Sequence, residues 1–109
     1  MRYCLALDLK DNDESIREYE RWHQNVWPEV LASIRESGIV GMEIYRAGNR
    51  LFMIMETSSD FSFERKSEAD NANPTVQQWE KLMWNFQKAL PFAQPGEKWI
   101  IMQRIFSLD

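Results

Sequence analysis

Two apolar segments in the middle of the chain, residues 39–46 and 51–57, constrain the fold more than any other feature. Both have the apolar and aromatic content of β-strands, and only Ala47-Gly48-Asn49-Arg50 separates them. Gly and Asn adopt the backbone conformations that a tight hairpin turn requires. We therefore expect an antiparallel hairpin, and the rest of the chain must pack around it.

The segments before and after the hairpin each contain one expected strand and two expected helices. Strands are expected at 3–9 and 98–106, and helices at 13–27 and 28–37 before the hairpin and at 61–69 and 74–90 after it. Asp13 is the expected N-cap of the first helix, and Pro28 predicts a kink at the Trp27-Pro28 step. This order predicts an α+β, ferredoxin-like βαββαβ fold, a four-stranded antiparallel sheet with its helices on one face.

Length and composition predict one domain, residues 1–109, that forms a homodimer. A domain of 109 residues has room for one core, yet the chain carries five Trp, six Phe and six Met. So many large apolar side chains exceed what a thin two-layer core can bury. We expect some of them to line a ligand cavity and others to lie between two sheets that pair face to face as a dimeric α/β-barrel.

The charge and motif content excludes several classes of protein. The net charge is -4 and the basic residues are scattered among acidic ones, so a nucleic-acid partner is not expected. No apolar run approaches the ~20 residues of a membrane span, and no secretory signal is recognisable, so a cytoplasmic protein is the expectation. One His and one Cys do not make a zinc site, and no Gly-rich phosphate loop is present, so neither metal nor cofactor is expected.

The single histidine, His23, is the strongest candidate for chemistry. Helical spacing places Tyr19 one turn before it and Trp27 four residues after it, with Glu29 nearby. Imidazole transfers protons near neutral pH, and aromatic rings pack against the C–H face of a sugar. The alternative interpretation is an exposed or structural helix histidine, and composition alone does not decide between them.

Tyr45, Glu56 and Trp79 each have a structural interpretation and a ligand-binding one. Tyr45 and Glu56 are polar-tipped groups in apolar strands, which fits strand ends in water as well as a pocket. Trp79 belongs to a helical apolar stripe with Met83 and Phe86, which fits plain helix core as well as a ligand wall.

The sequence resembles the L-rhamnose mutarotase family, which includes members acting on L-fucose. The matching residues are Tyr19-x3-His23-x3-Trp27-Pro28-Glu29, Ile44-Tyr45, Leu51-Phe52 and Gln78-Trp79, and the similarity covers nearly the whole chain. The first motif fixes five residue types in eleven positions. One position differs, because Glu80 stands where relatives carry a second Trp.

The resemblance implies a dimeric, cofactor-free isomerase that interconverts the α and β anomers of a 6-deoxy-L-hexose. It implies that His23 transfers a proton, that Tyr19 orients His23 or the sugar, and that Trp79 lies in the sugar pocket. We expect Tyr45, Trp27, Glu29 and Glu80 among the substrate-binding residues. The second proton carrier is left open between Tyr45, Glu29, Asp8 and a bound water.

Two other functions fit the same scaffold. One is a cofactor-independent monooxygenase, and the other is a protein that binds a sugar or metabolite without catalysis. A bare dimerisation module is a third possibility, which predicts that no sugar perturbs the tryptophans.

Overall fold

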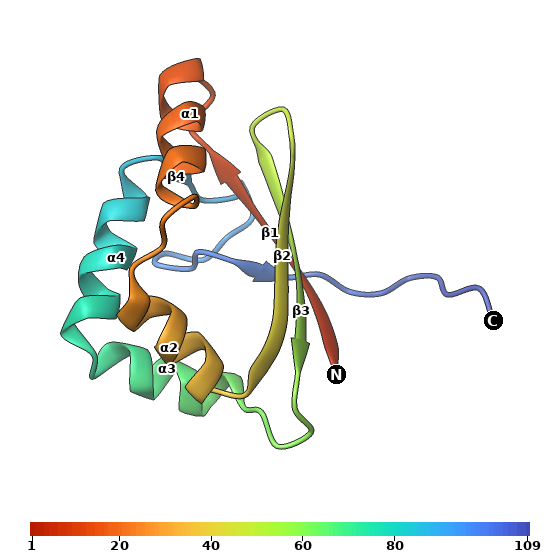
Figure 1. The fold of residues 1–109 in the computed structure, drawn as a ribbon. Helices are drawn as coiled ribbons and strands as arrows, with labels where there is room; N and C mark the ends of the chain where they lie inside the picture. Colours follow the sequence, from red (N-terminus) through yellow and green to blue (C-terminus); the bar gives the residue numbers. More distant parts are fainter.

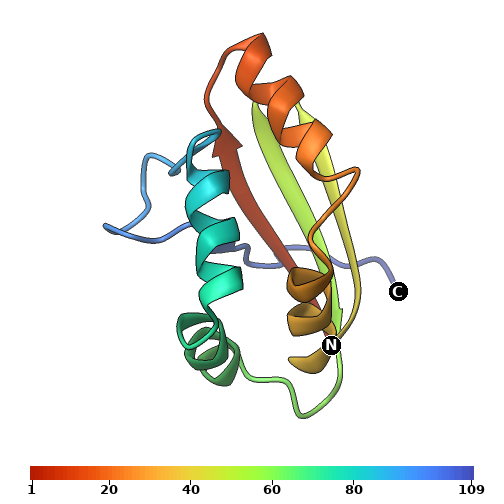
Figure 2. The ribbon, with the colours of Figure 1, turned by 60° about the vertical axis from the view of Figure 1, so that its left-hand side comes forward.

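The computed structural model describes residues 1–109 and has two layers, a sheet and a layer of helices. Figures 1 and 2 show all four helices on the same side of the sheet. The elements are β1 (Arg2–Leu9), α1 (Asp13–Trp22), α2 (Pro28–Glu36), β2 (Ile39–Ala47), β3 (Arg50–Thr57), α3 (Phe63–Asn71), α4 (Pro74–Trp84), β4 (Gln87–Lys88) and β5 (Ile100–Ile101). The predicted α+β, ferredoxin-like architecture is confirmed.

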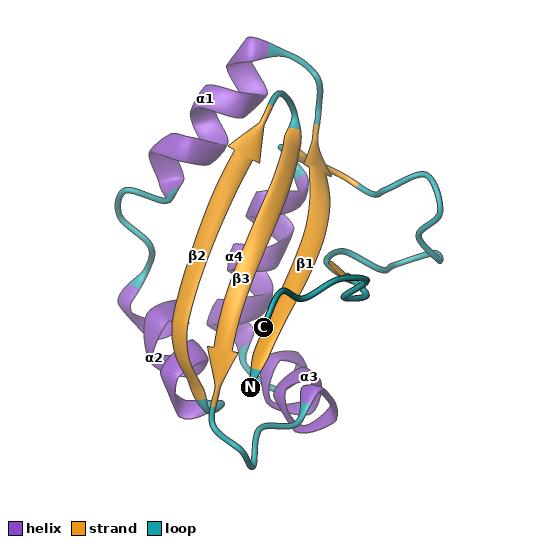
Figure 3. Cartoon of the chain, turned by 90° about the vertical axis from the view of Figure 1, so that its right-hand side faces the viewer, coloured by secondary structure: helices purple, strands orange, loops and turns teal.

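The sheet is antiparallel throughout, with the order β2-β3-β1-β4, and β5 pairs with β1 on the same side as β4. The predicted hairpin forms β2 and β3, with Tyr45 opposite Phe52 and Ile44 opposite Met53. Because side chains alternate along a strand, Ile44 and Met53 face the helices, whereas Tyr45 and Phe52 face away from them. Figure 3 looks directly at this second face, which no helix covers.

The connection between the first two helices differs from the prediction. Instead of a kink, five nonhelical residues, 23–27, separate α1 from α2. Trp27 has extended backbone (φ -57°, ψ 134°), as expected of a residue before proline, and Pro28 opens α2. The N-cap of α1 is Asn12, whose side chain accepts from the Ser15 amide, and not Asp13.

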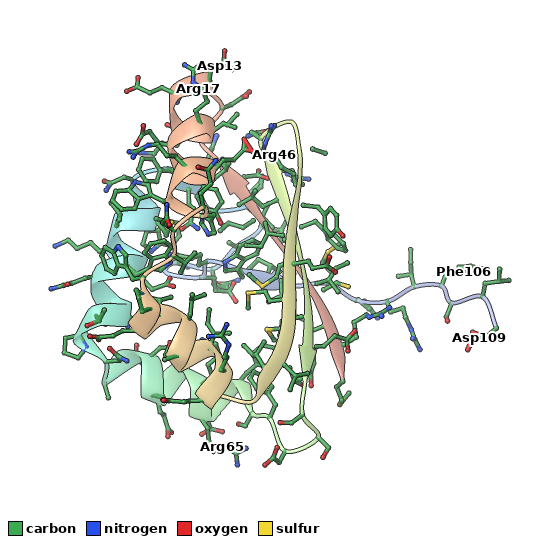
Figure 4. All side chains as sticks on the ribbon, in the orientation of Figure 1. Asp13, Arg17, Arg46, Arg65, Phe106 and Asp109 are labelled. Carbon is green, nitrogen blue, oxygen red and sulfur yellow. The ribbon has the colours of Figure 1, made fainter.

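The end of the chain also corrects the prediction. Helix α4 ends at Trp84 instead of Leu90, because Gln87 and Lys88 pair with β1 as β4. A single strand over 98–106 is not formed; only Ile100–Ile101 pairs with β1, and the Met102 amide adds one hydrogen bond to the Cys4 carbonyl. The remaining residues extend away from the body of the domain, where Figure 4 labels Phe106 and Asp109.

The core lies between the helices and the covered face of the sheet. It consists of two clusters of buried residues, one formed by Leu9, Tyr19, Val30, Leu51, Trp79 and Met83, the other by Leu5, Ile39, Met53 and Met55. No helix of the chain has the length and apolar character that a membrane crossing demands. The candidate site is in the first cluster.

Candidate functional site

A cavity of about 790 Å³ opens between the sheet and the helices. This volume is within the range of small-molecule sites, roughly 300 to 1,000 Å³. Most of its lining is apolar, and the polar groups fall into two sets. One set, Tyr19, His23, Glu80 and Gln87, comes from α1 and its C-cap, α4 and β4, and the other, Ser33, Arg35, Lys66 and Asp70, comes from α2 and α3. Few polar groups in an apolar wall are typical of a site that orients one small ligand.

The end of α1 fixes the orientation of the His23 imidazole. His23 is the C-cap residue of α1, and its Nδ1 lies 2.8 Å from the Tyr19 carbonyl oxygen one turn earlier. A carbonyl oxygen only accepts, so Nδ1 must carry the proton in this hydrogen bond. In the neutral ring, Nε2 is then the unprotonated nitrogen, which can accept a proton from a ligand.

Two environmental effects act on the pKa of His23. Burial lowers it, and the hydrogen bond to the Tyr19 carbonyl raises it to a smaller extent, so that the pKa lies below the ordinary value of 6.5. The imidazole is therefore neutral at physiological pH and suited to act as a base.

Aromatic rings surround the imidazole on two sides. The Tyr19 ring centroid is 4.2 Å from that of His23, and the Trp79 ring lies edge-on at 5.7 Å. Trp79 is itself held in place by Trp27, at 5.2 Å, and by Trp22, at 6.4 Å. Trp79 lines the cavity, whereas Trp27 packs against Trp79 without lining the cavity. In this chain Trp27 therefore contacts Trp79, and its predicted role in substrate binding stays a prediction.

Tyr19 contributes a hydroxyl that keeps its proton. The residue is 3% exposed. Burial raises the pKa of Tyr19 most strongly, the Gln87 amide next to the hydroxyl lowers it in part, and the Glu80 charge raises it further. Such a phenol serves as a hydrogen-bonding group and not as a base at neutral pH.

Glu80 lies at the cavity together with a partly buried cation. Its carboxylate is 2.6 Å from Nζ of Lys98, which also donates to the Glu80 carbonyl oxygen at 3.2 Å. The same ammonium lies 4.7 Å from the centre of the Trp84 ring. Burial lowers the pKa of Lys98, and the Glu80 carboxylate opposes this effect. The ion pair therefore holds Glu80 at the cavity as a hydrogen-bond acceptor.

Three predicted residues are not brought to this cavity. Tyr45 is 53% exposed on the open face of the sheet, where its hydroxyl donates to Glu43. Glu29 is exposed in the first turn of α2. Asp8 forms a two-point ion pair with Arg50, at 2.7 and 3.1 Å, at a position whose side chain alternates with the inward-facing leucines of β1. Side chains alternate between the two faces of a strand, which explains the positions of Tyr45 and Asp8. Each is next to a residue that faces the helices, so its own side chain faces the other way.

Sequence reasoning missed Gln87 and Lys98 as residues of the site. The sequence pattern predicts a helix through Gln87, but α4 ends three residues before it, and the pattern predicts a strand from Lys98, but the strand begins at Ile100. Apolar residues recur at helical spacing over 76–86, and this pattern does not indicate that the backbone becomes extended at residue 87. No three His, Cys, Asp or Glu side chains gather in a way that would hold a metal ion.

Comparison with known proteins supports one family. The model of the family described as L-rhamnose mutarotase matches residues 2–108. The L-fucose mutarotase of Xanthomonas campestris pv. campestris is 50% identical over 99% of this chain and 88% of its own length. The L-rhamnose mutarotase of Phocaeicola vulgatus is 30% identical over 99% of this chain and 98% of its own length. The crystal structure of the L-rhamnose mutarotase FA22100 from Formosa agariphila has the same fold, with a TM-score of 0.72 at 20% identity over 100% of this chain and 99% of that one.

Proposed function

Because this chain belongs to the L-rhamnose mutarotase family, we propose that it is an isomerase that interconverts the α and β anomers of L-fucose, with His23 as the base. The observation that carries the catalytic assignment is the position of His23. Its Nδ1–H is fixed by the Tyr19 carbonyl, and burial keeps the ring neutral at the wall of a cavity large enough for a monosaccharide.

The proposed reaction requires two proton transfers. Nε2 of His23 takes the proton of the anomeric hydroxyl while the ring oxygen O5 gains a proton from a bound water, and the C1–O5 bond breaks to give the open-chain aldehyde. Rotation about C1–C2 presents the other face of the carbonyl to O5. The ring then closes by the reverse transfers: the C5 hydroxyl attacks C1 and returns its proton to the hydroxide left by the bound water, and His23 gives its proton to the former aldehyde oxygen, which becomes the new anomeric hydroxyl.

We assign the second transfer to water because of where the other candidates lie. Tyr45, Glu29 and Asp8 are all outside the cavity of this chain, and Tyr19 has a raised pKa. The uncatalysed reaction already occurs in water, so the protein needs only a modest acceleration. One positioned acid–base group contributes about 10² to 10⁴-fold, which is sufficient.

L-Fucose is preferred over L-rhamnose in this proposal for two reasons. The chain is 50% identical to an L-fucose mutarotase and 30% identical to an L-rhamnose mutarotase. In addition, a carboxylate at position 80 accepts hydrogen bonds from hydroxyls, which an indole does not. The two sugars differ in the configuration of hydroxyls, so a changed acceptor affects the choice between them.

Saturation transfer between the α and β anomeric protons, measured by NMR, tests this function. Catalytic amounts of the protein should accelerate exchange in both 6-deoxy-L-hexoses, and more in L-fucose. Faster exchange in L-rhamnose would contradict the assigned substrate. Binding of either sugar without accelerated exchange would instead identify a non-catalytic sugar-binding protein.

We also propose that two chains pair through the open sheet face, as the ferredoxin-like scaffold implies. Tyr45 on β2 is 53% exposed, and the C-terminal residues Ile105, Phe106 and Leu108 are 92%, 74% and 88% exposed. Apolar side chains exposed in such number at one side of a domain indicate an interface. In this arrangement each C-terminal tail, residues 102–109, lies on the sheet of the second copy. The cellular compartment stays a prediction.

A further inference from the structure

Gln87 has a buried hydrogen-bonding group that the fold does not satisfy. It is the first residue of β4, lines the cavity and is 4% exposed. Its Oε1 atom is buried without a hydrogen-bond partner. A buried acceptor without a partner is unfavourable, because it has given up its hydrogen bonds to water without replacing them. Such a group in a cavity indicates a partner that arrives from outside.

Strand register directs the Gln87 side chain toward the cavity. Gln87 is directly opposite Leu9 in the β1–β4 pair, and opposite residues project from the same face of a sheet. The Leu9 side chain is fully buried in the cluster that contains Tyr19 and Met83. The next residue, Lys88, is opposite Asp8 and exposed, so it projects from the other face. The amide of Gln87 is therefore held on the helix side by backbone pairing.

The groups beside Gln87 match a polyhydroxylated ligand. The Tyr19 hydroxyl is close enough for the Gln87 amide to change its pKa, and the Glu80 carboxylate acts on the same hydroxyl. The Gln87 amide oxygen and the Glu80 carboxylate accept hydrogen bonds, the Gln87 NH2 group donates, and the Tyr19 phenol does both. The set therefore offers acceptors for the O–H groups of a sugar and donors for its oxygens.

We propose that Gln87 is a substrate-binding residue whose Oε1 accepts a hydrogen bond from a ring hydroxyl of the monosaccharide, beside Tyr19. This inference rests on the proposed function for the class of ligand. The assignment places the sugar between the His23 end of α1 and strand β4, so that Gln87 orients the ring whose anomeric hydroxyl reaches Nε2 of His23. The cost of the unpaired oxygen in the free protein is then recovered when the sugar binds.

The Gln87→Met variant tests this inference, because Met has nearly the same length and shape without the amide. The matched control is Gln78→Met, which makes the same change at an exposed position of α4. The probes are L-fucose and its 2-, 3- and 4-deoxy derivatives. Affinity is measured by tryptophan fluorescence, and anomer exchange by NMR saturation transfer.

We expect Gln87→Met to bind L-fucose about 5- to 10-fold more weakly than wild type, the loss of roughly one hydrogen bond. One deoxy derivative should bind to wild type and Gln87→Met equally, which identifies the hydroxyl. The thermal unfolding midpoint of Gln87→Met should equal or exceed that of Gln78→Met, because the variant removes an unsatisfied buried acceptor.

Either of two results would overturn the inference. One is unchanged affinity of Gln87→Met for L-fucose, and the other is a clearly lower unfolding midpoint than that of the control, which would show that the amide serves the fold. Failure of the proposed function gives a different pattern: wild type would bind L-fucose without accelerating exchange, and weaker binding by Gln87→Met would still support the role of Gln87.

Discussion

The His23 imidazole is held by one hydrogen bond and modified by its burial. The Tyr19 carbonyl that accepts from Nδ1 is in the last turn of α1, where it also accepts from the backbone amide of the C-cap residue His23. The same contact thus caps the helix and selects the tautomer. The sequence predicted the pairing of Tyr19 with His23 from their four-residue spacing, but it did not reveal that the backbone carbonyl, and not the phenol, orients the ring.

The first residue-scale prediction concerns the pH dependence of exchange. Because His23 acts as a base and burial lowers its pKa, we expect kcat/KM to fall toward acid pH with a midpoint below pH 6.5. The measurement is the catalysed anomer exchange rate of L-fucose between pH 4.5 and 8, corrected for the uncatalysed rate. An acid limb with its midpoint above 6.5 would contradict the assignment of His23.

The same pKa shift has a consequence for stability. A histidine with a lowered folded-state pKa is fully neutral in both states above the unfolded value of 6.5, and its protonation favours the unfolded state below it. The His23 contribution to the free energy of unfolding is therefore lost as pH falls through the folded-state pKa. The difference in the free energy of unfolding between wild type and His23→Asn, followed across this pH range, should isolate the His23 contribution.

The second residue-scale prediction concerns the Glu80–Lys98 pair. Removing the carboxylate in Glu80→Gln leaves Lys98, whose side chain is 12% exposed, without its charge partner. Breaking a fully buried pair costs roughly 3 to 5 kcal/mol, but the Glu80 side chain is 43% exposed and solvent screens it. We expect a loss of about 1 to 2 kcal/mol in the free energy of unfolding, measured with urea.

Glu18→Gln is the control for this variant, because Glu18 pairs with Arg21 on the exposed surface of α1. We expect its stability to stay close to that of wild type, because solvent screens an exposed ion pair. Equal effects of the two substitutions would show that the burial of Lys98 does not matter.

At the scale of elements, local signals were predictable and long-range pairing was not. The β2–β3 hairpin was predicted because its turn residues are adjacent in sequence. Strand β4 was not, because its only ladder partner is β1, nearly eighty residues earlier, and its sequence continues the helical pattern of α4. The residue missed at the site, Gln87, is in this segment.

The element-scale prediction concerns Gly38, which joins α2 to β2. Gly38 has φ +99°, and a Cβ atom there would lie 2.8 Å from the Ser58 hydroxyl oxygen. Gly48 in the hairpin turn has φ +60° but open space around it. We expect Gly38→Ala to lower the free energy of unfolding by about 2 to 3 kcal/mol and Gly48→Ala by about 1 kcal/mol. Equal losses in urea denaturation would contradict the close approach of Ser58.

At the scale of the whole molecule, the asymmetry of the domain is the main feature. The helices cover one face of the sheet, the other face is open, and the C-terminal tail projects from the body on that side (Figure 1). The surplus of large apolar residues predicted an interface, but the sequence did not distinguish a long last strand from a short strand followed by a tail. The apolar sequence pattern is the same for a long strand and for an extended tail. Which of the two forms depends on the residues that lie beside the segment in the fold.

The whole-molecule prediction is that the tail contributes to dimer formation. Wild type should sediment at twice the monomer mass at micromolar concentration, and Phe106→Ser should shift the equilibrium toward monomer. Phe92→Ser is the matched control, since Phe92 is 69% exposed in the loop after β4 and Phe106 is 74% exposed in the tail. Sedimentation of Phe106→Ser as an unchanged dimer would exclude the tail from the interface, and a monomeric wild type would exclude the dimer.

The most direct test of the account is the rate of L-fucose anomer exchange in His23→Asn, measured by NMR saturation transfer beside wild type. The Asn amide can still donate to the Tyr19 carbonyl, so the end of α1 should be preserved, but it provides no base at the position of Nε2. We predict unchanged folding and sugar binding, with a loss of about 10² to 10⁴-fold in catalysed exchange. A His23→Asn protein that folds, binds L-fucose and exchanges its anomers as fast as wild type would contradict the account.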